Sequence, residues 1–317
     1  MKFYILCHQC IDWLKHHAKT IPFKDQVVVI NSLDNDFVDQ ASTYCQENSI
    51  EYHITESDGT PATGKNSVMR VFLESDNEYM VQVDGDDEIT EYGYQFYTDV
   101  SKRECPPDSI IIYNQFQRAT DEVLLDKETR EVIGSVSTSR SKPWTRSSDF
   151  CFWTDEFRSR NFSSVPEEDV NEWEYTRKVY FDWFWRLGEG EVGHSHRDIF
   201  QRMVFFSRKA AELAHFDPKL FIGDDTIATV KMKEHFRRGD IKMVRHNEDR
   251  GDEKYTYLYW FDRKGIMRTF MESDVSWSSL PINSDYSWYI TIVDYMEENN
   301  IFENYKHLEN LTVPDII

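Results

Sequence analysis

The stretch YMVQVDGDDEIT, residues 79–90, joins a strand signal to an acidic cluster. Its first five residues are mostly β-forming, and four of the five residues from 84 to 88 are acidic. Because like charges repel, a cluster of this kind at the end of a strand needs either full solvation or a cation beside it. The glycine at position 85 lets a ligand approach the backbone closely. The stretch therefore predicts a buried strand with a polar site at its end.

Three interpretations compete for the acidic cluster of residues 84–88. A solvated turn predicts no link to polar residues at neighbouring strand ends. An EF-hand calcium loop needs Gly at its sixth position and Glu at its twelfth, where this chain has Ile89 and Gln95. A Mg²⁺ or Mn²⁺ ion that bridges a diphosphate needs hard oxygen ligands, which three aspartates supply here: Asp84, Asp86 and Asp87. The calcium loop is excluded, and the other two interpretations stay open on this stretch alone.

Strand and helix signals alternate along the first 116 residues. Short apolar runs predict strands at residues 3–7, 27–30, 50–54, 79–83 and 110–113. Apolar residues recur at helical spacing between these runs, and Thr90 is placed to cap the helix that follows it. The alternation predicts an α/β fold with a mostly parallel central sheet and helices on both faces. Ligands bind at the carboxyl edge of such sheets, where His8, Asn31 and Asp84 are expected.

The second half of the chain is less regular. Its pattern predicts a hairpin at residues 123–133, a mobile Ser/Thr/Arg-rich loop at 135–148 and helices at 207–214 and 225–236. A further hairpin around residues 262–265 and a helix at 287–299 follow. We expect three parts, residues 1–116, 117–246 and 247–317, the last being a C-terminal hairpin and helix elaboration.

Composition narrows the functional classes. The 317 residues are 40% hydrophobic, which suffices for one large core, and the formal net charge of −21 argues against unspecific coating of nucleic acid or anionic membrane. No apolar run approaches the ~18 residues of a membrane span, and His8 ends the first apolar run too early for a signal peptide. The five cysteines have no framework spacing, so reduced thiols in a cytoplasmic protein are expected.

Several segments, in order along residues 1–246, resemble the GT-A glycosyltransferases of the family 2-like branch. VQVDGDDEIT is similar to their DxD motif, and ESDGTPATGKN to a glycine-containing loop in which Lys65 stands for an arginine. QVVVINSLDND is similar to a strand ending in a base-contacting acidic residue, where this chain has Asn31. GDDTIATVKMKEHF resembles the acceptor-side helix that an acidic pair opens, and VRHNED a basic or histidine position near the metal.

This resemblance implies a metal-dependent, inverting transfer of a sugar from a nucleoside diphosphate sugar, a UDP-sugar above all, to a hydroxyl group. Residues 1–116 would bind the donor and residues 117–246 the acceptor. Asp225 would be the general base and Asp224 its partner, although both residues also suit plain helix capping. The implied ligands of Mn²⁺ or Mg²⁺ are Asp84, Asp86, Asp87 and His246. The implied donor contacts are His8, Asn31, Asp58, Lys65, Asp84 and Arg245, of which Lys65 and Arg245 equally suit solvated charges.

Basic residues interleaved with aromatics suggest the acceptor. Residues 138–148 contain no acid, and the acceptor candidates are Arg140, Lys142, Trp144, Arg146, His194 and His196. Such a set suits DNA, and the Asp-, Asn- and Tyr-rich style is similar to phage-encoded glycosyltransferases, some of which modify hydroxymethylcytosine. A cell-surface glycan suits the aromatics equally, and the oligomeric state is not predicted. A two-metal nucleotidyltransferase and a non-catalytic binding module remain the competing classes.

Overall fold

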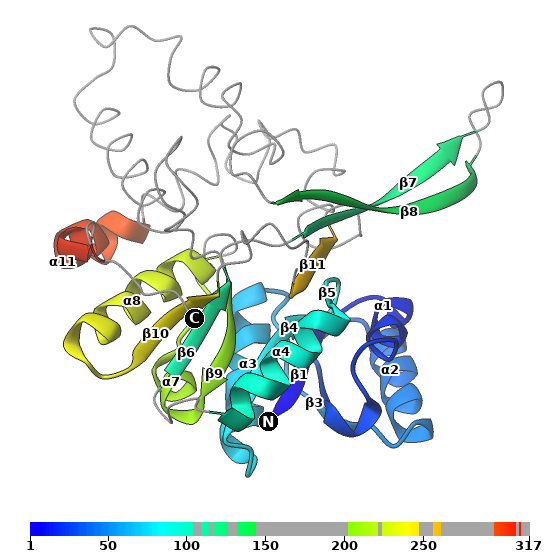
Figure 1. Cartoon of the computed structure of the whole chain (residues 1–317), viewed down its shortest axis with the longest axis horizontal. Helices are drawn as coiled ribbons and strands as arrows, with labels where there is room; N and C mark the ends of the chain where they lie inside the picture. The colour runs from blue at the N-terminus through cyan, green and yellow to red at the C-terminus, as the bar shows by residue number, and fades with distance from the viewer. Residues whose placement is uncertain are drawn as a thin grey trace, which may run out of the picture.

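The computed structural model describes residues 1–103, 109–113, 117–125, 132–143, 202–220, 224–246, 256–260, 295–308 and 311. Its centre is a seven-stranded sheet in the order β10-β6-β9-β4-β1-β2-β3 (Figure 1). The strands are β1 (Lys2–Cys7), β2 (Gln26–Ile30), β3 (Glu51–Ile54), β4 (Tyr79–Asp84), β6 (Ser109–Tyr113), β9 (Arg202–Ser207) and β10 (Lys242–His246). The five strands predicted in the first 116 residues are all present, with bounds shifted by one residue at most.

Neighbouring strands of this sheet run parallel except where β9 lies antiparallel to both β4 and β6. The prediction of a mostly parallel sheet is therefore confirmed. Because the parallel strands end at one edge, the residues that follow β1, β2 and β4 gather there. The end of β10 reaches the same edge, since His246 pairs in register with Tyr113 of β6.

Helices cover both faces of the sheet, as predicted. The first face packs against α1 (Ile11–His17), α2 (Asn35–Glu47) and α4 (Glu91–Arg103), and the second against α3 (Pro61–Glu74), α7 (Arg208–Leu213) and α8 (Asp224–Arg238). Phe3 and Ile5 belong to the first core and Tyr4 and Leu6 to the second, because side chains alternate along a strand. Each fully buried side chain of this size contributes about 1.5–3 kcal/mol.

Side-chain caps define where the helices begin. Asp34 accepts hydrogen bonds from the backbone N–H groups of Asp36 and Phe37 (3.0 and 3.2 Å) at the start of α2. Thr60 accepts one from Thr63 at the start of α3, and Thr90 accepts one from Gly93 (2.9 Å) at the start of α4. The prediction that Thr90 caps a helix is confirmed. Each such cap contributes about 1 kcal/mol.

A second, four-stranded sheet has the order β5-β11-β7-β8. It consists of β5 (Glu88–Ile89), β11 (Tyr257–Trp260), β7 (Gln117–Leu125) and β8 (Val132–Pro143), and the β7–β8 hairpin extends away from the larger sheet (Figure 1). The hairpin is confirmed, but the loop predicted at 135–148 is wrong for residues 135–143, which are in β8. Serine-rich composition is typical of a loop. Pairing with the nine-residue β7 instead supplies hydrogen bonds to the backbone N–H and C=O groups of this segment.

The C-terminal segments join the rest of the chain at two places. β11 is antiparallel to β5 and parallel to β7, so it borders the acidic stretch; the second arm of its predicted hairpin lies outside the described residues. Farther on, α11 (Ile301–Tyr305) and η4 (Lys306–Leu308) follow residues 295–298, which are helical as predicted. Glu234 of α8 accepts a hydrogen bond from His307 (2.8 Å). Among the described helices, none has the length and apolar character that crossing a membrane requires.

Candidate active site

The acidic loop after β4 is a tight turn against β1. Leu6 pairs in register with Asp84, and a Cβ atom added to Gly85 would collide with the carbonyl oxygen of Leu6. Only glycine fits this position without a shift of the backbone. The N–H of Asp87 donates to the carbonyl of Asp84 (3.0 Å) and closes the turn. Asp84 and Asp86 are half-buried here.

Asp87 points into the protein. Its carboxylate accepts a hydrogen bond from the hydroxyl of Tyr257 (2.8 Å), and both residues are 1% exposed. Beside it, the N–H of Thr90 donates to the carbonyl of Thr256 (3.2 Å). Asp87 thus anchors the loop to β11, and its role as a metal ligand stays a prediction. No local pattern singles out Tyr257, because its partner is 170 positions away.

Two histidines at the end of α1 hold the other side of the loop. His17 is 2% exposed, and its Nε2 donates to the carbonyl of Gly85 (3.2 Å). His16 Nε2 lies 3.2 Å from a carboxylate oxygen of Glu88. Neither histidine was predicted as a site residue, since a histidine pair in a short helix has no distinguishing pattern. Together with Tyr257 they fix where the aspartates of the loop lie.

The residues after β1 and β2 tie the strand ends together. Asn31 is buried, and its amide donates to Thr55 Oγ1 (2.9 Å) and to the carbonyl of Glu56 (2.7 Å). A carboxylate at this position could not donate these bonds. Ser32 donates to the backbone carbonyl of His8 (2.6 Å), which links the ends of β1 and β2. His8 and Asn31 therefore lie at the carboxyl edge, as predicted.

Asp58 organises the start of α3. It accepts hydrogen bonds from the backbone and hydroxyl of Thr60 (2.9 and 2.7 Å) and from the hydroxyl of Thr63 (2.7 Å). Burial works toward a higher pKa, but the bonds from Thr60 and Thr63 outweigh it and lower the pKa of Asp58. Asp58 is exposed and has this local role whether or not it also contacts a donor.

Lys65 of α3 lies among acids from two other elements. Its Nζ is 3.0 Å from Asp224 Oδ2, and only 12% of the lysine side chain and 5% of the aspartate side chain are exposed. Burial alone would lower the pKa of Lys65, but Asp224, Asp225 and Asp84 together raise it. Burial raises the pKa of Asp224, while Lys65 opposes that rise and Asp225 adds to it. The structure thus brings the end of β4 and the start of α8 to one lysine.

Asp225 differs from its neighbour in burial. Asp224 is 4% exposed, whereas Asp225 is half-buried. Both open α8, where the positive end of the helix favours carboxylates. The hydroxyl of Thr229 donates back to the carbonyl of Asp225 (2.8 Å), a bond within the helix. The arrangement leaves Asp224 in an ion pair and Asp225 nearer the surface.

The remaining predicted residues are placed by their strands or not described. Arg245 and His246 end β10, in register with Ile112 and Tyr113. Arg140 and Lys142 lie on β8. Trp144, Arg146, His194 and His196 lie outside the described residues. Their proposed acceptor contacts stay predictions.

A divalent cation fits this site only together with a substrate. In the part of the chain that the structure describes, no group of three or more His, Cys, Asp or Glu residues forms a metal cluster. Asp84 and Asp86 supply two half-buried carboxylates at one strand end. Mg²⁺ is commonly held by one or two carboxylates, with phosphates and water completing the octahedron. The donor set therefore suits a metal–diphosphate site rather than an all-protein cage.

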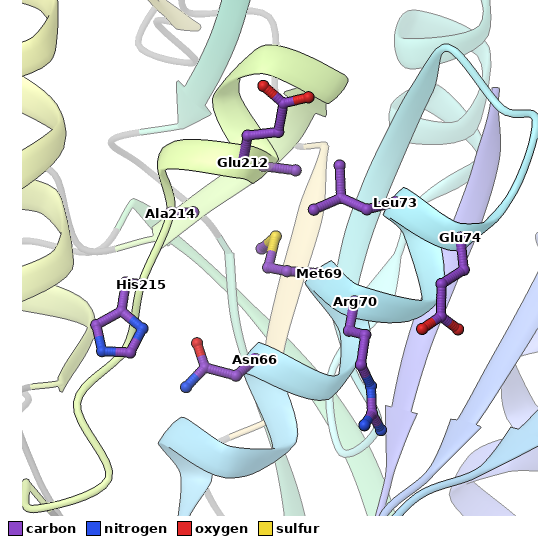
Figure 2. Close-up of a pocket in the computed structure, with 9 residues that line it drawn as sticks. Asn66, Met69, Arg70, Leu73, Glu74, Glu212, Ala214 and His215 are labelled. Atoms are coloured by element: carbon purple, nitrogen blue, oxygen red, sulfur yellow. The ribbon is translucent and has the colours of Figure 1, made fainter.

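A groove of about 460 Å³ lies between α3 and α7 (Figure 2). Met69 and Leu73 point into it, and Arg70, Glu74 and Glu212 lie at its rim (Figure 2). The other lining residues are Asn66, Ala211, Ala214 and His215. The groove contains none of the predicted site residues.

No protein-family model and no curated protein matches the sequence. Among solved structures, residues 1–349 of S. aureus TarS in complex with UDP-GlcNAc align over 93% of this chain and 66% of that chain, with 11% identity and a TM-score of 0.45. The mannosyltransferase PcManGT from Pyrobaculum calidifontis, in complex with GDP-Man and Mn²⁺, aligns over 83% and 57%, with 12% identity and a TM-score of 0.41. At these values the similarity assigns neither family nor activity, and this chain spans less than two thirds of either.

Proposed function

We propose that the protein is a metal-dependent, inverting glycosyltransferase that moves a sugar from a nucleoside diphosphate sugar to a hydroxyl group. The observation that carries the proposal is the convergence of Asp84 with Asp224 and Asp225 on Lys65. Transfer of a glycosyl group needs one acidic group for a cation on the leaving diphosphate and a second to accept a proton. The two acidic groups come from different elements, β4 and α8, so each can serve one of the two roles.

The donor side of the proposal uses the carboxyl ends of β1, β2 and β4. A divalent cation bound there would neutralise the charge that develops on the leaving diphosphate. Asp84 and Asp86 would hold it, with Asp87 behind them, on a loop fixed by His17 and Tyr257. A UDP-sugar is the proposed donor and Mn²⁺ or Mg²⁺ the proposed metal. His246 is an additional proposed ligand, and the proposed donor contacts are His8, Asn31, Asp58 and Arg245.

The acceptor side of the proposal uses the start of α8. The acceptor oxygen attacks the anomeric carbon, the bond to the diphosphate oxygen breaks, and the acceptor proton passes to Asp225. Asp225 is half-buried, whereas Asp224 is held by Lys65 and would orient its neighbour. Attack opposite the leaving group inverts the configuration at that carbon. The proposed mechanism therefore has one displacement step and uses one general base.

The register of the β7–β8 hairpin supports an anionic acceptor. Arg118 pairs with Arg140, and a register shift next to this pair brings Gln117 opposite Pro143. Since β7 pairs with β11, which borders the acidic loop, this basic register is on the same sheet as that loop. The proposed acceptor is DNA that carries hydroxymethylcytosine, and a cell-surface glycan is the other acceptor to test.

The test is a transfer assay with a matched inactive variant. The protein is incubated with Mn²⁺, a panel of nucleotide sugars and either hydroxymethylcytosine DNA or a glycan, and products are identified by mass spectrometry. One sugar added to one acceptor, and none with Asp225→Asn, is the expected result. Turnover of nucleoside triphosphates regardless of sugar would favour a nucleotidyltransferase. Absence of any transfer or turnover in the wild-type protein, with ligand binding unchanged in Asp86→Asn and Asp225→Asn, would favour a binding module.

A further inference from the structure

Lys65 is buried in a way that does not suit a ligand of donor phosphate. Its ammonium group is 3.0 Å from Asp224 and also lies 5.4 Å from the centre of the Phe216 ring. A lysine that binds phosphate presents its charge to the site as a point cation. Here the charge is already balanced by protein groups, because Asp224, Asp225 and Asp84 all act on it. The lysine is the internal counter-ion of the acidic centre.

The next residue of α3 grips the same part of the chain. Asn66 donates to the carbonyl of Phe216 (2.6 Å) and accepts from its N–H (3.0 Å), so one side chain satisfies both backbone groups. Phe216 lies between α7 and α8, and Asp224 is the first residue of α8. Two consecutive residues of α3 therefore dock this segment, one by amide pairing and one by charge. The ion pair is made with Asp224, the residue directly before the candidate base Asp225.

We propose that Lys65 is a positioning residue, which sets the place of Asp224 and Asp225 relative to Asp84 and does not bind the donor phosphates. The chemical meaning of this role rests on the proposed glycosyl transfer, but the ion pair itself does not. Asp224 is only 4% exposed, and a buried carboxylate is costly without a cation beside it. Removing the lysine would leave three acids facing one another and displace the start of α8 from the loop of β4.

The charge of Lys65 also affects how tightly the acidic loop binds a metal ion. A cation beside Asp84 repels a second cation, so Lys65 weakens binding of Mn²⁺ in the absence of nucleotide. A phosphate ligand would have the opposite signature, because its removal would weaken nucleotide binding and leave metal binding alone. The two roles are therefore distinguished by equilibrium measurements that need no turnover.

The experiment compares Lys65→Met, Lys65→Arg and the double variant Lys65→Met/Asp224→Leu. Calorimetry measures Mn²⁺ without nucleotide and UDP with saturating Mn²⁺, and thermal unfolding is followed for each variant. We expect Lys65→Met to bind Mn²⁺ about threefold or more tightly, to change UDP affinity by less than about threefold, and to melt at a lower temperature. Lys65→Arg should keep the wild-type melting temperature, and the double variant should recover most of the loss, because it removes both buried charges.

Kinetics separates positioning from plain stability. In Lys65→Met, kcat should fall with little change in KM for the donor, and Lys65→Arg should restore most of kcat. A loss of UDP affinity by more than about tenfold, with Mn²⁺ affinity unchanged, would overturn the proposal and indicate that Lys65 binds phosphate. Unchanged melting and unchanged Mn²⁺ affinity would overturn it in favour of a solvated charge. If the wild-type protein binds no nucleoside diphosphate, the proposed function fails. The melting temperatures of the single and double variants still test the ion pair between Lys65 and Asp224.

Discussion

The hydroxyl of Tyr257 donates a 2.8 Å hydrogen bond to the carboxylate of Asp87, which is 170 residues earlier in the chain. Both side chains are 1% exposed. The bond makes a C-terminal strand part of the acidic loop, although sequence patterns place the two in different parts of the chain. The geometry of the loop therefore depends on residues 256–260.

Tyr257→Phe should lower both stability and metal affinity. The variant removes one donor from a buried carboxylate, which costs about 1–3 kcal/mol, and it loosens the loop that carries Asp84 and Asp86. Urea unfolding and Mn²⁺ calorimetry measure the two effects. Tyr295→Phe is the matched control, because it removes the 2.6 Å bond to Asp217. The control should lose stability alone, and an equal loss of Mn²⁺ binding in both variants would refute the specific role of Tyr257.

Gly85→Ala should damage the loop for a steric reason. The new methyl group would collide with the carbonyl of Leu6, so the turn after β4 must move. We expect Mn²⁺ affinity to fall by about tenfold or more and stability to fall by about 1–3 kcal/mol. Gly239→Ala is the control: Gly239 has a φ of +80° but nothing within 4 Å of the added atom. It should cost stability through backbone strain and leave Mn²⁺ affinity unchanged.

Asp224→Asn and Asp225→Asn should fail in different ways. Asp225→Asn should keep wild-type melting and UDP binding but reduce transfer by about 10²–10⁴-fold, the range typical of a lost general base. Asp224→Asn should reduce stability by about 3 kcal/mol, since it leaves Lys65 without its 3.0 Å partner. Thermal unfolding and single-turnover kinetics separate the two. Identical behaviour of the two variants would contradict the division of roles.

Glu234 should make the attachment of the C-terminal residues sensitive to acid. Hydrogen bonds from Arg237, His307 and Arg238 outweigh burial and hold the pKa of Glu234 well below its ordinary value of 4.5. A depressed carboxyl pKa stabilises the fold above the ordinary value, and the stabilisation is lost as pH falls below it. Because the arginines are about half exposed, the contribution is about 1 kcal/mol.

The measurement for Glu234 is urea unfolding of wild type and Glu234→Gln between pH 7 and pH 3. The difference in unfolding free energy should be largest near neutral pH and shrink toward pH 3. Glu303→Gln is the control, since Glu303 pairs with Lys306 on the surface, where both side chains are at least half exposed. A difference that does not change with pH would contradict the linkage.

The fold was largely predictable because its strands are short apolar runs separated by helical patterns. Val27–Val29 are fully buried on both faces, which is what an uninterrupted apolar run in a parallel sheet indicates. The positions of Asp84 and Asn31 at the carboxyl edge were predictable in the same way, because each residue comes at the end of such an apolar run. These signals are local, so a single sequence contains them.

The rest depends on contacts between distant segments. Residues 135–143 form a strand because β7 lies beside them, and serine-rich composition alone does not indicate it. Lys65 pairs with Asp224, which is 159 positions away, and no local pattern indicates that contact. His17 and Tyr257 carry no motif, and their function follows only from the carbonyl and carboxylate they meet. Pairing over such separations is set by the packed structure and not by local pattern.

The antiparallel position of β9 between β4 and β6 has a consequence for synthesis of the protein on the ribosome. The strands β1 to β4 can pair as they emerge, because their neighbours are close in the chain. β6 emerges next but has no place on the edge of β4 until Arg202–Ser207 has been made. During that interval the nascent chain exposes one edge of β4 and both edges of β6, the kind of surface that aggregates or recruits chaperones. Slow translation after residue 113 would lengthen that exposure, and rapid delivery of β9 would end it.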